Sequence, residues 1–194
     1  KIMLNHTFIV ALIAALFGYS VMNLLMTATP VTMRSETFTD NNITRVIQWH
    51  VVGMFAPGFF TGNLIKRFGV VRIIVVGSIL LLISVCIALS GDSFIHFFIT
   101  LFCVGVGWNF TFTGGTLLVT EVHSPSEQAK VQGINDFILF TGLALSSLFA
   151  GVIYHFMGWI WVNLATMPMI IAVLFSAIWL RSIRQKERLN SKLT

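Results

Sequence analysis

Residues 70–90 read VVRIIVVGSILLLISVCIALS. The stretch carries a single charge, Arg72, near its beginning, and all its other side chains are apolar or small. A helix needs about 20 mostly apolar residues to cross a hydrocarbon layer roughly 30 Å thick, because each residue adds about 1.5 Å. Residues 70–90 therefore predict a membrane-spanning helix rather than a helix of a soluble core.

Five further stretches of the same kind flank this one along the chain. They cover residues 8–30, 43–65, 94–120, 131–154 and 159–180. The connections between them are short and rich in turn-forming residues, and the ten-residue alternating segments of a membrane β-barrel are absent from the sequence. We therefore expect one all-α domain over residues 1–194, a bundle of six transmembrane helices, followed by a basic tail at 181–194.

The overall composition agrees with this interpretation. Hydrophobic residues make up 56% of the chain and charged residues only 10%, whereas soluble domains carry about 25% charged residues. The first apolar stretch is longer than the 7–15 residues of a signal-peptide core, so we interpret it as a true span. The net charge of +5 does not indicate a nucleic-acid partner, because the basic residues follow alternate loops instead of one folded face.

The distribution of basic residues predicts the orientation in the membrane. With six spans, both termini lie on the same side. Ten of the twelve Lys and Arg residues lie on that side, and only Arg34 and Arg45 lie on the other. Because Lys and Arg are enriched in cytoplasmic loops, we expect both termini to be cytoplasmic. The basic tail is expected to contact anionic headgroups, with a dedicated partner site as the alternative.

Polar residues separate the six predicted spans into two groups. The third and sixth spans are almost uniformly aliphatic and are expected to face lipid. The other four spans carry polar side chains: Tyr19, Ser20, Asn23, Gln48, His50, Asn109, Thr111, Thr113, Thr116, Asn135, Asp136, Thr141, Ser146 and Ser147. Since polar groups are costly in hydrocarbon unless they face protein or a water-filled cavity, these four spans are expected to line an interior.

Small residues suggest where helices approach one another. The fourth span contains Gly105, Gly107 and the pair at 114–115, which either pack helices closely or let the span bend at a binding site. In the fifth span, Gly142, Ser146 and Ala150 recur every four residues. That stripe predicts a helix–helix contact rather than a binding site.

Several polar and aromatic residues are candidates for a substrate site. The candidates are Tyr19, Asn23, His50, Asn109, Phe110 and Thr113. Asn109 lies near the middle of its span, the depth at which transporters bind substrate, although an interhelical hydrogen bond would also explain it. His50 lies in the outer third of its span. There it would contact substrate or take up and release protons during transport, with a hydrogen-bonded packing role as the alternative.

Asp136 is the only acidic residue within a predicted span. A carboxyl group there suits proton uptake and release during transport, because burial favours its neutral form. The alternative is structural: an acid near a helix N-terminus is stabilised by the helix dipole and pairs with a basic loop residue. Either way, one acid does not supply the paired groups that an intramembrane enzyme needs, and no catalytic, metal-binding or cofactor motif appears in the sequence.

Residues 62–72, between the second and third spans, read GNLIKRFGVVR. This loop resembles the signature of the major facilitator superfamily, Gly-x-Leu-x-Asp-Arg-x-Gly-Arg-Lys. Arg67 matches the signature arginine, while Lys66 replaces the acid, and Val70 and Val71 replace the basic pair. The resemblance implies a gating role for Lys66 and Arg67. The weakened motif is similar to the copy in the carboxyl-terminal half of such proteins.

Two other stretches extend the resemblance over the whole chain. Residues 105–121 and the run QGINDF at 132–137 look like the tenth and eleventh helices of bacterial efflux-type permeases. The resemblance implies the carboxyl-terminal half of a secondary transporter of the bacterial inner membrane. It also implies proton-coupled efflux of small organic solutes by alternating access, with an amino-terminal six-helix half as partner. A homodimer of two copies and a membrane scaffold without transport are the alternatives.

Overall fold

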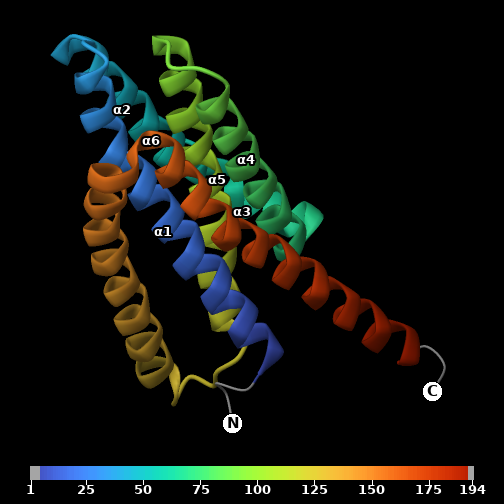
Figure 1. The fold of residues 1–194 in the computed structure, drawn as a ribbon. Coiled ribbons are helices and arrows are strands. Elements are labelled where there is room, and N and C mark those ends of the chain that lie inside the picture. Colours follow the sequence, from blue (N-terminus) through green and yellow to red (C-terminus); the bar gives the residue numbers. More distant parts are fainter. Residues whose placement is uncertain (1–4, 192–194) are drawn as a thin grey trace.

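The computed structural model describes residues 5–191, and within this range every regular element is a helix. The helices are α1 (His6–Ser35), α2 (Asp40–Phe55), α3 (Gly58–Phe68), α4 (Val70–Ser90), α5 (Phe94–Thr120) and α6 (Gln128–Asn190) (Figure 1). The expected all-α bundle is confirmed. Lys1 and Lys192, which belong to the predicted cytoplasmic charge, and the last three residues of the predicted tail lie outside the described residues.

Four of these helices, α1, α4, α5 and α6, are long and apolar enough to cross a membrane. The second predicted span is divided between α2 and α3, which have 16 and 11 residues. The fifth and sixth predicted spans both lie in α6, which has 63 residues and bends at Gly158. We call residues 128–157 the first arm of α6 and residues 159–190 its second arm.

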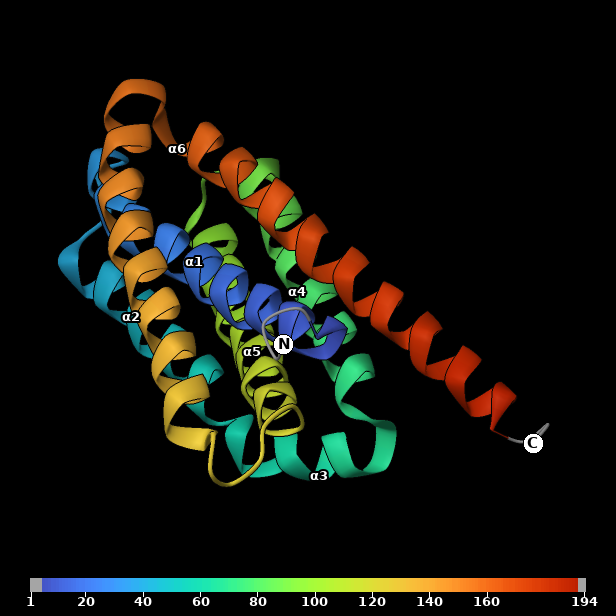
Figure 2. The same cartoon turned by 90° about the horizontal axis from the view of Figure 1, so that it is seen from below.

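Two residues explain where these helices are divided. Pro57 lies between α2 and α3; it has no backbone N–H to donate, and its ring clashes with the preceding turn of a helix. Gly158 has φ +80°, a left-handed conformation that glycine adopts without strain. In Figures 1 and 2 the second arm of α6 turns back at this point and runs across α1 and α4.

Helix α5 lies at the centre of the bundle, in contact with α1, α2 and α4. A Cβ atom on Gly105 would lie 2.6 Å from the His50 carbonyl oxygen of α2, and one on Gly115 would lie 2.8 Å from the Ala11 carbonyl oxygen of α1. These distances leave no room for a side chain. Because α5 is one continuous helix, its glycines serve close packing, and the alternative of a bend at these positions is not observed.

This packing makes Gly105 sensitive to a single methyl group. We expect Gly105→Ala to lower the free energy of unfolding by about 1–3 kcal/mol, because the new Cβ meets backbone atoms that cannot rotate away. Gly151→Ala is the matched control, since a Cβ there meets nothing within 4 Å and alanine is the better helix former. Thermal unfolding of both variants in detergent measures the difference. Equal midpoints would contradict the packing argument.

The first arm of α6 packs against α1 through the predicted small-residue stripe. A Cβ on Gly142 would overlap the Leu16 side chain, and Ser146 and Ala150 are both buried. The Asn23 amide group of α1 donates a 2.9 Å hydrogen bond to the Ser146 hydroxyl. The stripe is therefore a helix–helix contact, as expected from its spacing.

Candidate functional site

Four aromatic side chains from three helices meet inside the bundle. Trp108 and Phe112, one turn apart on α5, stack with ring centroids 5.0 Å apart and planes inclined by 13°. Tyr19 of α1 lies 5.5 Å from the Trp108 ring and 5.3 Å from the Phe112 ring. Phe55, the last residue of α2, meets Trp108 edge-on at 6.4 Å. We call these four residues the aromatic cluster.

The aromatic cluster is open on one side. Phe55 is 62% exposed, and Tyr19 and Phe112 are half-buried. Trp108 is only 8% exposed, and its indole N–H has no hydrogen-bond partner among the described residues. A buried indole normally finds an acceptor. The indole nitrogen is buried, so the open side of the cluster presents flat apolar faces, an arrangement that suits a planar aromatic ligand.

Polar groups adjoin this cluster. Asn23 lies one turn beyond Tyr19 on α1, and its amide nitrogen donates to the Leu143 carbonyl oxygen (3.2 Å) and the Ser146 hydroxyl of α6. Its carbonyl oxygen accepts no hydrogen bond within the part of the chain that the structure describes. Thr113 follows Phe112 and is half-buried. Of the predicted substrate residues, Tyr19 thus belongs to the aromatic cluster and Asn23 adjoins it on α1, whereas Thr113 is turned by about 100° from Phe112 on α5.

Asn109 has a different setting, at the break between α2 and α3. Its amide nitrogen donates a 2.8 Å hydrogen bond to the Met54 carbonyl oxygen, and its own oxygen accepts one of 2.7 Å from the Thr61 hydroxyl. In an uninterrupted helix the Met54 carbonyl would accept the N–H of Gly58. Asn109 thus bridges the two ends of the broken span, so the structure favours the interhelical hydrogen bond over a direct contact with solute.

His50 lies inside the contact between α2 and α5 and is fully buried. Its Nδ1 is 2.7 Å from the Leu101 carbonyl oxygen. Because a carbonyl only accepts, Nδ1 carries the proton in this arrangement. The second nitrogen, Nε2, has no partner among the described residues. The structure places His50 in helix packing, away from the open side of the aromatic cluster.

Phe110 points away from the other predicted substrate residues. Successive helical residues are turned by about 100°, so Phe110 lies on the opposite side of α5 from Trp108. It is buried in the core cluster formed with α4, and its Cβ lies 2.9 Å from where a Cβ on Gly77 would be. Trp108, Phe112 and Phe55 take the place predicted for it. The four-residue spacing of Trp108 and Phe112 on a polar span was the sequence signal for that aromatic face.

Asp136 lies on an exposed face of the first arm of α6. Its carboxylate accepts a 3.2 Å hydrogen bond from the Asn135 amide group, and Phe137 and Phe140 beside it are 73% and 63% exposed. The burial expected for Asp136 is therefore not provided by the described residues. Exposed phenylalanines on a membrane-spanning helix contact lipid or another helix, so the surroundings of the Asp136 carboxyl group lie outside residues 5–191.

A second acid near the start of α6 is held in its charged form. The Ser124 hydroxyl and backbone N–H donate hydrogen bonds of 2.7 and 3.3 Å to the Glu127 carboxylate. These bonds, the hydroxyl's first, lower the pKa of Glu127. A carboxyl group with a lowered pKa stays ionised at neutral pH. Glu127 is therefore an ionised side chain that bonds the loop backbone just before the start of α6.

Lys66 and Arg67 lie on the exposed end of α3. The Arg67 guanidinium lies over the ring of Phe68, 5.2 Å from its centroid. Neither residue forms an ion pair with a carboxylate of residues 5–191. A gating ion pair at this loop would need an acid from outside the described part of the chain.

Comparison with known proteins places this geometry in context. The sequence profile of the Major Facilitator Superfamily matches residues 8–194. The riboflavin transporter RfnT of Brucella anthropi is 42% identical over 178 residues, which cover 92% of this chain and 45% of that protein. The uncharacterized MFS-type transporters YdeG and YddS of Bacillus subtilis are 35% and 34% identical over about 70% of this chain. The chain spans less than half the length of these curated relatives.

Proposed function

This chain belongs to the major facilitator superfamily, and from that premise we propose that it forms half of a secondary transporter for a planar aromatic solute. It is an integral membrane protein of a transporter family, not an enzyme. The observation that carries the proposal is the aromatic cluster, with its stacked Trp108 and Phe112 rings and its open side at Phe55. The name of the Brucella relative supports riboflavin, whose ring system is flat and polar at its edges, as the first solute to test.

A second six-helix unit is part of the proposal. Large apolar side chains are exposed on α3 and on the first arm of α6, among them Phe59 at 91% and Phe156 at 77%. The exposed side of the aromatic cluster, at Phe55, adjoins α3. We propose that an amino-terminal half covers these faces and completes the pathway, with a second copy of this chain as the alternative. The doubled length of the relatives supports the amino-terminal half.

Riboflavin flux in proteoliposomes tests the proposal. The whole protein that carries this chain is compared with the chain alone, both at equal amounts in the membrane. We expect flux that saturates with riboflavin and requires both halves. Flux from the chain alone would favour two copies of it. Absence of flux for riboflavin and for other planar heteroaromatic compounds would leave the scaffold as the better explanation.

Proton coupling through Asp136 is the next part of the proposal. We expect Asp136→Asn to abolish the response of riboflavin flux to a pH gradient, while exchange of labelled for unlabelled riboflavin continues, because an amide cannot release a proton. Asp92→Asn, at an exposed acid outside the helices, is the control. A normal response to the gradient in Asp136→Asn would rule out this role.

The direction of transport and the orientation in the membrane complete the proposal. The resemblance of residues 132–137 to efflux-type permeases supports export across the bacterial inner membrane. The excess of Lys and Arg supports cytoplasmic termini, and Figure 1 shows the beginning of α1, the α5–α6 loop and the end of α6 toward one end of the bundle. Flux into inside-out vesicles, but not into right-side-out vesicles, is the expected result. The opposite preference would indicate uptake.

A further inference from the structure

A cavity of about 190 Å³ lies between the α3–α4 junction and the last turns of α6. None of its lining residues belongs to the aromatic cluster. Its lining residues are Phe68, Gly69, Val70, Val71, Arg72, Arg181, Arg184, Gln185 and Arg188. Four of the nine are arginines and none is acidic. We call it the arginine pocket. A concave site lined by positive charges attracts anions.

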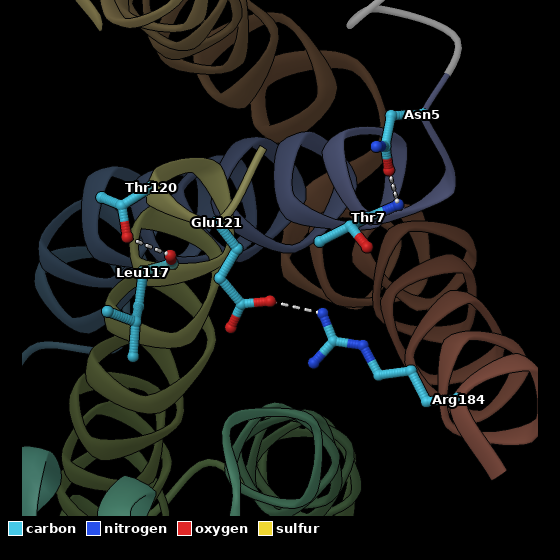
Figure 3. A network of polar contacts seen from close by, with 6 residues as sticks. All are labelled: Asn5, Thr7, Leu117, Thr120, Glu121 and Arg184. Atoms are coloured by element: carbon cyan, nitrogen blue, oxygen red, sulfur yellow. Dashed lines mark hydrogen bonds and ion pairs between the residues drawn. The ribbon is translucent and has the colours of Figure 1, made fainter. Parts of the chain in front are cut away.

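The four arginines come from two helices and converge on one space. Arg181, Arg184 and Arg188 are three and four residues apart, so they share one face of α6, while Arg72 belongs to the first turn of α4. Arg184 also donates a 2.5 Å hydrogen bond to the Glu121 carboxylate at the end of α5 (Figure 3). The other three have no carboxylate within 4 Å in the described part of the chain. The pocket therefore keeps uncompensated positive charge.

The backbone at the pocket favours the same sign of ligand. Gly69, with φ +91°, separates α3 from α4, and no side chain caps the N-terminus of α4. The first N–H groups of a helix lack intrahelical acceptors and attract anions. Val70 and Val71, the first two residues of α4, line the pocket, whereas the Gly69 N–H is already donated to the Ile65 carbonyl oxygen.

Apolar side chains continue from the pocket along both helices. On α4, Val76, Ile79 and Ile83 are each more than 40% exposed and lie on the same face as Arg72. On the second arm of α6, Ile171, Phe175 and Ile178 are exposed in the turns before Arg181. On each of the two helices, exposed apolar residues thus lie next to arginine at the end that carries the pocket.

We propose that the arginine pocket binds the phosphate of an anionic phospholipid, whose acyl chains lie along the two apolar stripes. Guanidinium groups bind phosphate oxygens through paired hydrogen bonds, and basic pockets at the ends of membrane helices suit lipid headgroups. A soluble phosphate would satisfy the arginines but would leave the stripes without a role. The site is separate from the aromatic cluster and does not depend on the proposed solute.

Native mass spectrometry of the whole protein in detergent tests this site. Phosphatidylglycerol is the probe, phosphatidylcholine is the lipid without net charge, and glycerol 1-phosphate is the soluble competitor. The variant R181Q/R188Q removes two charges from the pocket. The matched control K130Q/K186Q removes two charges from exposed residues outside the pocket.

We expect the wild type to bind phosphatidylglycerol roughly tenfold more tightly than phosphatidylcholine. The reason is that each basic group near an anionic headgroup adds to the binding free energy. That preference should vanish in R181Q/R188Q and persist in K130Q/K186Q. Equal loss of this preference in both variants would overturn the proposal, because the preference would then depend on general surface charge and not on the arginine pocket. Competition by glycerol 1-phosphate at concentrations similar to those of the lipid would overturn the lipid as occupant. Absence of any preference in the wild type would overturn the site itself.

Discussion

Trp108→Ala is expected to reduce riboflavin transport by about tenfold or more at subsaturating riboflavin. Trp108 forms the stacked pair with Phe112 and also contacts Tyr19 and Phe55, so its removal opens the centre of the aromatic cluster. Stacking of a heteroaromatic ring on an aromatic side chain contributes about 1–3 kcal/mol, which corresponds to roughly 5- to 150-fold in affinity.

Two comparisons separate solute binding from folding in this experiment. Trp161→Ala removes an indole that is 52% exposed on the second arm of α6, and its transport should equal that of the wild type. Trp108→Phe keeps a flat ring and should retain more activity than Trp108→Ala. Flux is normalised to the monodisperse protein recovered from the membrane. Undiminished flux in well-folded Trp108→Ala would contradict the aromatic cluster as the solute site.

Asn109→Leu is expected to lower the free energy of unfolding by about 2–4 kcal/mol. The side chain is 6% exposed and bonds both the Met54 carbonyl oxygen and the Thr61 hydroxyl. An apolar replacement leaves the carbonyl without this donor, and a buried polar group that loses its partner costs about 1–3 kcal/mol. Thermal or denaturant unfolding in detergent provides the measurement.

Asn163→Leu is the matched control for Asn109→Leu. Asn163 is also buried, but its amide nitrogen donates only to the Trp159 carbonyl oxygen within its own helix, and its oxygen has no partner among the described residues. Leucine there removes an unsatisfied atom together with a local bond, so the change in stability should be small. A double-mutant cycle of Asn109→Leu with Thr61→Val should show a coupling energy. Additive effects of that pair would refute the bridge across the break.

The helical class of this protein follows from local properties of the sequence. Apolar stretches of about 20 residues must satisfy their backbone hydrogen bonds internally in a membrane, and a helix does so without reference to distant residues. The turn at Gly158 is equally local, because a left-handed backbone conformation favours glycine. The break at Pro57 is also encoded locally, because proline has no N–H to donate within the span expected over residues 43–65.

The site was predicted less completely, because its residues are distant in sequence. Tyr19 and Asn23 were expected on the interior, and the structure places them beside the aromatic cluster. Phe110 was expected with them but faces α4, since rotation by about 100° per residue turns it away from Trp108. A periodic pattern shows which residues of one helix share a face. It does not show which face meets α1, α2 or α4.

The sequence by itself determined the membrane class, the helical architecture and the asymmetry of basic residues between the two ends, because hydropathy and charge act along each segment separately. The tertiary structure alone decided the role of each polar side chain. Asn109 bonds the ends of a broken helix, His50 bonds α5, and the Trp108 indole N–H has no acceptor among residues 5–191. The reason is that hydrogen bonding and stacking require atoms within a few ångströms, and only the packing of separate helices brings those atoms together.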